Sequence, residues 1–146
     1  MIAELDEQKR VFRPQFMLDT DTASFSLRGG YPNIDYRIAR TPNTSLCISS
    51  ITRGELQFGV LRKPGATKLS QAIAGLLQRI PTLAFDAFAA DQYSKIALNL
   101  RQRGVLIGQN DTYIAAHAIS IGATLVTHNV RHFERVEGLS IVDWTV

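Results

Sequence analysis

The sequence has little cysteine and no long hydrophobic run, and these two absences narrow the class of protein. Cys47 stands alone and leaves no partner for an internal disulfide. Its neighbours Leu46 and Ile48 indicate a buried apolar residue rather than a reactive thiol. No apolar stretch is long enough to cross a membrane, and residues 1–13 lack the apolar centre of a secretory signal. We therefore expect a cytoplasmic protein without a membrane partner.

Grouped cysteines are also missing, which argues against a cysteine-ligated zinc site. The chain has 146 residues, and 16 Lys or Arg against 13 Asp or Glu give a net charge of +3. This mildly basic balance permits an anionic partner such as nucleic acid without demanding one. Internal repeats and low-complexity segments are absent. A chain of this length, with 45% hydrophobic residues, suits one domain with a single core.

Short strand-forming runs alternate with amphipathic helices along the chain. The clearest helix spans residues 87–103, where apolar side chains recur at helical spacing before Gly104 ends it. This alternation predicts an α/β fold with a parallel sheet covered by helices on both faces. Residues 1–15 are expected to form an N-terminal extension and residues 16–146 the domain. The expected strands cover 15–18, 45–49, 82–85, 123–127 and 139–142, and the expected helices cover 20–27, 32–40, 51–62, 66–79, 87–103 and 111–121.

Acidic or amide side chains follow several of these strands, and each has a local explanation. Asp19 suits a helix N-cap as well as a ligand, and Asp21 suits the first helical turn, where the macrodipole favours a carboxylate. The pattern Thr52-Arg53-Gly54-Glu55 matches a capping box, with Thr52 as the N-cap. Asn110 is predicted to cap a later helix, so Asp111 is free for another role. Asn129 suits a loop position that tolerates left-handed backbone.

The joint pattern of these residues predicts more than each residue does alone. In an open α/β sheet, binding sites lie beyond the carboxyl ends of the strands. Asp19, Glu55, Asp111 and Asn129 recur at that side of successive strand–helix units. Clustered carboxylates repel one another unless a cation neutralises them. Oxygen ligands of this kind favour a hard cation, Mg²⁺ or Mn²⁺.

Four ordered blocks of the sequence resemble those of PIN domains, and most closely those of VapC-type toxins from bacterial toxin–antitoxin pairs. The blocks are residues 17–20, 48–59, 107–118 and 125–133, and residues 136–144 resemble the family's C-terminal strand. The resemblance covers about residues 16–146. It implies a PIN-like three-layer sandwich with a mostly parallel central sheet and helices on both faces.

The resemblance also implies a Mg²⁺-dependent endoribonuclease that acts as the toxin of such a pair, with Mn²⁺ as the alternative cation. By motif, Asp19, Glu55 and Asp111 match the catalytic acidic triad, and Asp19 and Asp111 match the metal ligands. Asn129 matches a fourth catalytic position that is often aspartate. Asp21 stands where this family more often has asparagine.

Chemistry suggests how such a site would work. Glu55 would orient or deprotonate the water that attacks the phosphate. His132 and Arg135, on the loop past Asn129, are further candidates for phosphate contacts. Candidates for supporting the acids or contacting RNA are Asp21, Thr20, Thr127 and Arg131.

The resemblance implies two protein partners besides the RNA substrate. One is a cognate antitoxin whose C-terminal segment lies near the active-site groove, and the other is a second copy of the chain in a homodimer. Exposed apolar side chains around Phe58 and Leu61 are candidates for either contact. The histidines carry less weight: His128 is expected to be structural or exposed, and His117 to be packed inside a helix.

Two other functions remain open at this stage. Asp19-Thr20-Asp21 after an apolar strand is similar to the nucleophile motif of haloacid-dehalogenase-type phosphatases, in which Asp19 would attack and Asp21 would act as the acid. Ala23 departs from that motif. The second alternative is a non-catalytic PIN-like binding module, which Asn129 favours because it removes a charge from the site.

Overall fold

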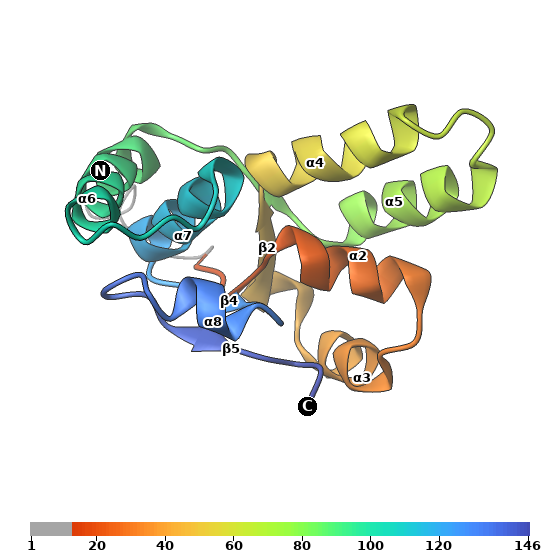
Figure 1. The fold of residues 1–146 in the computed structure, drawn as a ribbon. Helices are drawn as coiled ribbons and strands as arrows, with labels where there is room; N and C mark the ends of the chain where they lie inside the picture. Colours follow the sequence, from red (N-terminus) through yellow and green to blue (C-terminus); the bar gives the residue numbers. More distant parts are fainter. Residues whose placement is uncertain (1–12) are drawn as a thin grey trace, which may run out of the picture.

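The computed structural model describes residues 13–146, so the predicted N-terminal extension lies almost entirely outside the described residues. Strands and helices alternate as the sequence predicts (Figure 1). The strands are β1 (Phe16–Leu18), β2 (Leu46–Ser49), β3 (Thr82–Leu83), β4 (Thr124–Val126) and β5 (Ile141–Val142). The helices are α2 (Thr20–Arg28), α3 (Pro32–Arg40), the short 3₁₀ turn η1 (Asn43–Ser45), α4 (Ser50–Leu61), α5 (Thr67–Arg79), α6 (Ala87–Gln102), α7 (Gln109–Ile121) and α8 (Val130–Phe133). In this described part, no helix is both long enough and apolar enough to span a membrane.

The five strands form one sheet in the order β3-β2-β1-β4-β5, and every pairing is parallel. The predicted parallel α/β sheet is therefore confirmed. Beginning at β1, the chain builds the sheet outward through β2 and β3, and then continues on the other side of β1 with β4 and β5. The carboxyl ends of β1 and β4 consequently meet at a topological switch point, where open α/β sheets place their binding sites.

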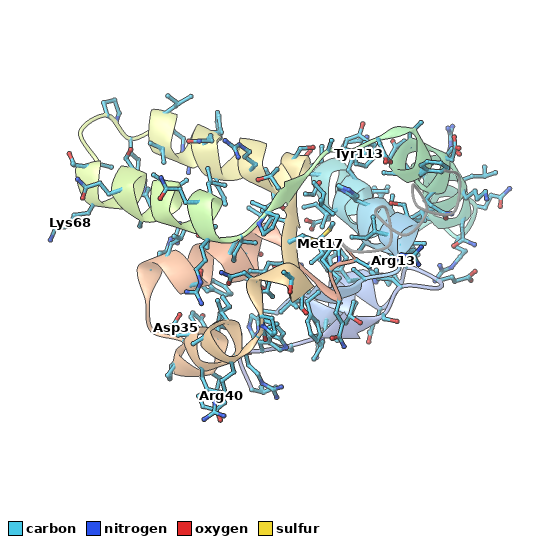
Figure 2. All side chains as sticks on the ribbon, turned by 180° about the vertical axis from the view of Figure 1, so that it is seen from behind. Arg13, Met17, Asp35, Arg40, Lys68 and Tyr113 are labelled. Atoms are coloured by element: carbon cyan, nitrogen blue, oxygen red, sulfur yellow. The ribbon has the colours of Figure 1, made fainter. Side chains whose placement is uncertain are left out.

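Alternating side chains of the strands divide the core into two layers. Met17 and Leu125 face one side of the sheet and pack with residues of α6 and α7. Leu18 and Val126 face the other side and pack with residues of α2, α3 and α5. Figure 1 shows these two groups of helices on opposite sides of the sheet. Seen from behind, Met17 lies near the middle of the molecule (Figure 2), and Cys47 beside it is fully buried, as predicted.

The differences from the predicted elements have local causes. Strand β3 ends at Leu83, before the predicted Phe85, because the Phe85 N–H donates to the Ser50 hydroxyl, 3.0 Å away, instead of to a neighbouring strand. Strand β5 begins later than predicted, because the Leu139 N–H donates back to the Val136 carbonyl, 3.4 Å away, in a turn that Gly138 permits with a φ of 81°. Helix α8 was not predicted because four residues are too few to show a helical period.

Candidate active site

Asp19 lies at the switch point, directly after β1. Its backbone N–H donates to the carbonyl oxygen of Val126 at the end of β4, 3.0 Å away. Its carboxylate accepts a 2.8 Å hydrogen bond from the Thr22 N–H, so the predicted N-cap of α2 is confirmed. The side chain is almost completely buried. Burial raises the pKa of Asp19 above its ordinary value, opposed by hydrogen bonds from Thr127 and Thr22 and assisted by the charge of Asp21.

Glu55 approaches this edge from α4, and the predicted capping box is wrong. Helix α4 begins three residues earlier than a Thr52 cap requires: Ser49 is the N-cap, and its hydroxyl accepts from the Ile51 N–H at 3.1 Å. Glu55 is therefore not engaged in capping. Instead, its carboxylate accepts a 2.7 Å hydrogen bond from the hydroxyl of Thr20 on α2. The same hydroxyl lies 3.2 Å from the Thr52 hydroxyl, so Thr20 holds the carboxylate and Thr52 in turn contacts Thr20.

Asp111 lies in the first turn of α7, and the predicted cap at Asn110 is also wrong. The helix begins at Gln109, and Gly108 occupies the N-cap with a φ of 89°. Burial raises the pKa of Asp111 from 3.8 to about 6, and the negative charge of Asp19 is the second cause. His132 lowers it, while Glu55 and Asp21 raise it further. Asp19, Glu55 and Asp111 therefore share one electrostatic environment, as the joint pattern predicts, and Asp21 adds a fourth negative charge to it.

Asn129 is not a left-handed loop residue: its φ is −88°, and it stands at the N-terminus of α8. Its N–H donates to the Thr127 hydroxyl at 3.0 Å, and its amide nitrogen lies 2.8 Å from Nδ1 of His132. The same Nδ1 is 3.4 Å from Oδ2 of Asp111. His132 and Arg131 therefore belong to a helical turn rather than a loop. The contact between His132 and Asp111 was missed because it depends on that unpredicted turn.

The other predicted site residues hold outer positions. Asp21 is exposed on the first turn of α2, as expected, and acts on Asp19 and Asp111 through its charge. Thr127 is fully buried and connects Asp19 to Asn129 through hydrogen bonds. Arg131 is exposed on α8, where its guanidinium is available to a ligand in solution.

The donor set fits a hard cation by its chemistry, although no ready-made cage is present. Within residues 13–146, no three acidic, histidine or cysteine side chains converge closely enough to hold an ion between them. Mg²⁺ does not need such a cage, because it keeps several waters and binds proteins through one or two carboxylates. Asp19 and Asp111 are the two acids whose pKa values are raised in this cluster. A cation beside them would remove the repulsion that, after burial, raises the pKa of Asp111.

A groove of about 640 Å³ extends from Glu55 along α4. Its lining includes Thr20 and Asn110 from the acidic edge and Phe58 and Arg62 from the next two turns of α4. Leu61, which the sequence pairs with Phe58, lines a separate hollow at the turn between α4 and α5. Both side chains are exposed, as predicted, with 62% of Phe58 and 80% of Leu61 accessible, but they line different hollows.

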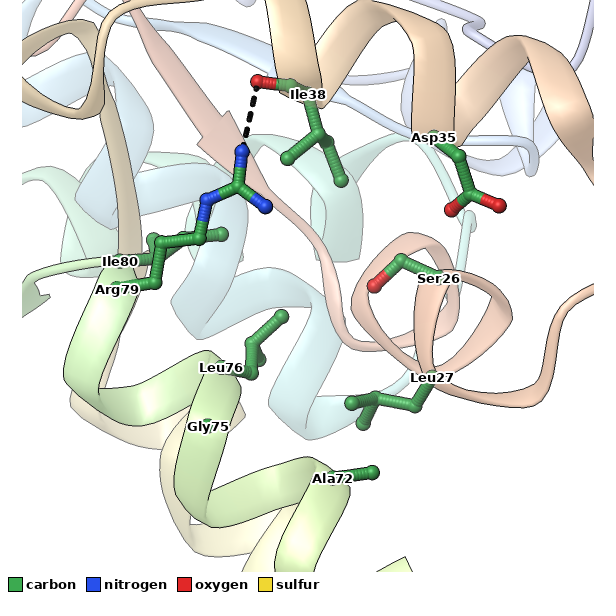
Figure 3. Close-up of a pocket in the computed structure, with 9 residues that line it drawn as sticks. All are labelled: Ser26, Leu27, Asp35, Ile38, Ala72, Gly75, Leu76, Arg79 and Ile80. Atoms are coloured by element: carbon green, nitrogen blue, oxygen red, sulfur yellow. Dashed lines mark hydrogen bonds between the residues drawn. The ribbon is translucent and has the colours of Figure 1, made fainter.

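A further hollow of about 530 Å³ lies between α2, α3 and α5, away from the edge that carries Asp19, Glu55 and Asp111 (Figure 3). Arg79 reaches across it to donate a 3.4 Å hydrogen bond to the Ile38 carbonyl. The arginine thereby connects α5 to α3, and none of the predicted site residues lines this hollow. Its polar contacts are internal to the fold, which indicates a structural role.

The histidines outside the acidic edge are structural, as expected. His128 Nδ1 lies 3.1 Å from Asp143 and is held near the C-terminus. His117 is buried inside α7, where its Nδ1 lies 2.8 Å from the Ser49 hydroxyl and Phe85 packs edge-on against its ring. His117 therefore joins α7 to the start of α4, the helix that carries Glu55.

Burial of His117 makes the fold sensitive to acid. Burial lowers its pKa below 6.5, opposed by the charge of Asp86. The unfolded chain therefore takes up a proton at higher pH than the folded one, and the free energy of unfolding falls as the pH drops below about 6.5. Denaturant unfolding at pH 7.5 and pH 5.5 should show wild type losing stability relative to His117→Gln. Equal losses in both proteins would contradict this.

A parallel sheet whose switch point gathers acids from three elements is the arrangement of a PIN domain. The family model described as "PIN domain" matches residues 32–139, and the chain belongs to this family. Within it, the chain belongs to the VapC-type ribonucleases. It is 37% identical over 131 residues to the tRNA(fMet)-specific endonuclease VapC of Salmonella typhimurium, covering 89% of this chain and 98% of the relative. It is 33% identical to Ribonuclease VapC2 of Rickettsia felis, covering 88% and 97%.

Solved structures agree with this assignment. The crystal structure of DNA-bound VapBC from Salmonella typhimurium contains a chain that superimposes with a TM-score of 0.85 at 35% identity, covering 90% of this chain and 98% of that one. VapBC2 from Rickettsia felis, bound to a DNA fragment from its promoter, gives 0.78 at 31% identity, with coverage of 88% and 98%. The predicted PIN-like sandwich is thus confirmed, and family membership favours the nuclease over the phosphatase.

Proposed function

We propose that the chain is a divalent-cation-dependent endoribonuclease and the toxin of a toxin–antitoxin pair. The observation that carries the proposal is the gathering of Asp19, Glu55 and Asp111 at the switch point of the sheet, where burial and then the charges of Asp19 and Glu55 raise the pKa of Asp111 to about 6. Carboxylates gathered in this way destabilise the folded protein unless a bound cation neutralises their charge, and such clusters are typical of functional sites. The relatives named ribonuclease or endonuclease VapC supply the substrate class.

Asp19 and Asp111 would hold the cation, Mg²⁺ or Mn²⁺. When bound, such a cation polarises the scissile phosphate and lowers the pKa of a coordinated water. Glu55 would orient or deprotonate the attacking water, and the Thr20 hydroxyl at 2.7 Å keeps its carboxylate in place. The second oxygen of Glu55 remains available for that water.

The remaining predicted residues would support this site. Thr127 holds Asp19, and its hydroxyl also accepts from the Asn129 N–H. Asn129 contacts His132, which in turn contacts Asp111. Arg131 would bind a phosphate of the RNA, because it is exposed on the same short helix. Asp21 contributes charge from an outer position.

The partners proposed for the chain follow from its relatives. The neighbouring structures are complexes of VapC with VapB, some of them bound to DNA. By analogy, a cognate antitoxin would hold the toxin inactive, with its C-terminal segment near the active-site groove. A homodimer is proposed on the same basis. Since the substrate is cellular RNA, the toxin would act in the cytoplasm.

Purified protein should cleave RNA, with initiator tRNA as the first substrate to test because two relatives are named tRNA(fMet)-specific. EDTA should stop cleavage, and Mg²⁺ should restore it. Glu55→Gln should slow the reaction about 100-fold, as loss of a general base does. Asp91→Asn, an exposed acid on α6, is the matched control. RNA binding without cleavage under all these conditions would favour the non-catalytic module instead.

A further inference from the structure

One face of α4 continues the acidic edge along the groove. Glu55, Phe58 and Arg62 are spaced by three and four residues, so they share this face, and all three line the groove. The helix rises about 1.5 Å per residue, so Arg62 lies roughly 10 Å along the axis from Glu55. The groove therefore carries an acid, an aromatic ring and a cation in that order.

Phe58 leaves a large apolar ring accessible to solvent, and Arg62 holds its guanidinium close to that ring. The Phe58 side chain is 62% accessible although it is large and apolar. The Arg62 guanidinium lies 5.5 Å from the ring centroid. None of the ion pairs found among residues 13–146 involves Arg62. Gly54 and Gly59 also line the groove, and a Cβ on either would meet no atom within 4 Å, so the groove is open at these two positions.

These features match single-stranded nucleic acid. Proteins bind single strands by stacking bases on exposed aromatic rings and placing cations against the phosphates. Phe58 offers a ring face, and Arg62 offers donors that phosphate oxygens accept. Because Glu55 lies one turn before Phe58, a nucleotide bound here would be adjacent to the bond that is cleaved.

We propose that Phe58 and Arg62 form a nucleotide-binding subsite, in which a base of single-stranded RNA stacks on Phe58 and its phosphate accepts hydrogen bonds from Arg62. The inference rests on the proposed ribonuclease function and adds a substrate-binding surface on α4. It assigns Phe58 to RNA and leaves Leu61, in its separate hollow, for protein contacts. The subsite would favour unpaired over duplex RNA, because only an unpaired base can stack on the ring.

The test measures binding of a short fluorescent single-stranded RNA by anisotropy, in the Glu55→Gln background so that the RNA stays intact. Phe58→Ala should weaken binding about 10-fold, and Phe58→Trp should retain it. Arg62→Gln should lower the slope of log affinity against log salt by about 0.7, the loss of one phosphate contact on a single strand. Phe58→Ala should leave that slope unchanged.

The chain provides a matched control on another face. Arg40 lies over the ring of Tyr36 on α3, 4.4 Å from its centroid, and neither residue lines the groove. Tyr36→Ala and Arg40→Gln should leave RNA binding unchanged. An equal loss of RNA affinity on substitution of the Phe58/Arg62 pair and of the Tyr36/Arg40 pair would overturn the subsite. Unchanged RNA affinity in Phe58→Ala would also overturn it. Unchanged RNA binding with lost antitoxin inhibition would assign this face to protein.

Failure of the subsite is distinguishable from failure of the ribonuclease function. If wild type does not cleave RNA with Mg²⁺, the proposed function fails. A second comparison uses wild type and the single variant Phe58→Ala, in which Glu55 is unchanged. If both cleave RNA with the same KM and kcat, only the subsite fails. The subsite predicts a raised KM in that variant. Because the Phe58 side chain is exposed, the thermal midpoint of unfolding of the Phe58→Ala protein should stay near that of wild type.

Discussion

Replacing Asp19 with asparagine should reduce RNA cleavage by about 10³-fold or more while making the fold more stable. Asparagine has the same shape, and its carbonyl oxygen caps a helix as well as a carboxylate does. The 2.8 Å bond from the Thr22 N–H is therefore kept. What is lost is one negative charge toward the cation, and an electrostatic contribution of several kcal/mol corresponds to this rate factor.

Stability should rise because the charge of Asp19 is unfavourable in the folded, cation-free protein. Burial raises the pKa of Asp19, so the ionised form is better solvated in the unfolded chain. Removing that charge relieves the repulsion of Asp111 as well. A residue with a purely structural role would instead lose activity and stability together.

Asp86 provides the control for Asp19. It is the N-cap of α6, where its carboxylate accepts from the Ala89 N–H at 3.0 Å, and it lies outside the acidic edge. Asp86→Asn should keep both the cleavage rate and the cap. Cleavage would be measured on purified protein with saturating Mg²⁺, and stability by denaturant unfolding in EDTA. An Asp19→Asn protein that is folded and cleaves like wild type would refute the assigned role.

Long-range pattern predicted the site better than local pattern did. Asp19 was ambiguous between cap and ligand, and the structure places it as the cap within the acidic cluster, so the two roles coexist. The recurrence of acids after successive strands predicted their common edge because parallel strands end on the same side. This rule does not depend on where a helix begins.

Helix starts were harder to predict, because several capping residues occur together. Ser49, Ser50 and Thr52 are all residue types that cap helices, and the sequence does not distinguish Ser49, the N-cap in the structure, from the other two. The Thr20 contact to Glu55 depends on how α2 and α4 pack. The contact of His132 with Asp111 depends on a four-residue helix that shows no period. Contacts between elements therefore required the structure.

Replacing Asp111 with asparagine should stabilise the cation-free protein by about 1–2 kcal/mol at pH 7. Its pKa rises from 3.8 to about 6, and a shift of about two units corresponds to roughly 3 kcal/mol. The side chain is 34% exposed, so solvent screening reduces the gain, and the helix dipole opposes it by about 0.3–1 kcal/mol. Asp91→Asn should change stability little.

The pH dependence follows from the sign of the Asp111 shift. Between pH 3.8 and about 6 the folded chain binds more protons at Asp111 than the unfolded chain does. The contribution of this group to stability therefore falls as the pH rises through that window and is constant above it. Comparing denaturant unfolding of wild type and Asp111→Asn in EDTA isolates the group, and the advantage of the variant should disappear near pH 4.

With Mg²⁺ at pH 7, wild type should become more stable than Asp111→Asn, the reverse of the order expected in EDTA. A cation that binds only the folded state adds about 2.7 kcal/mol at 100 times its Kd. Wild type, with both Asp19 and Asp111, should gain this stabilisation, whereas Asp111→Asn should gain little because one ligand has lost its charge. The part of the Asp111 pKa rise that comes from neighbouring acids, after the larger effect of burial, then has the same origin as its proposed role as a ligand: acids held together for a cation repel one another without it. Equal Mg²⁺ stabilisation of both proteins would separate Asp111 from cation binding.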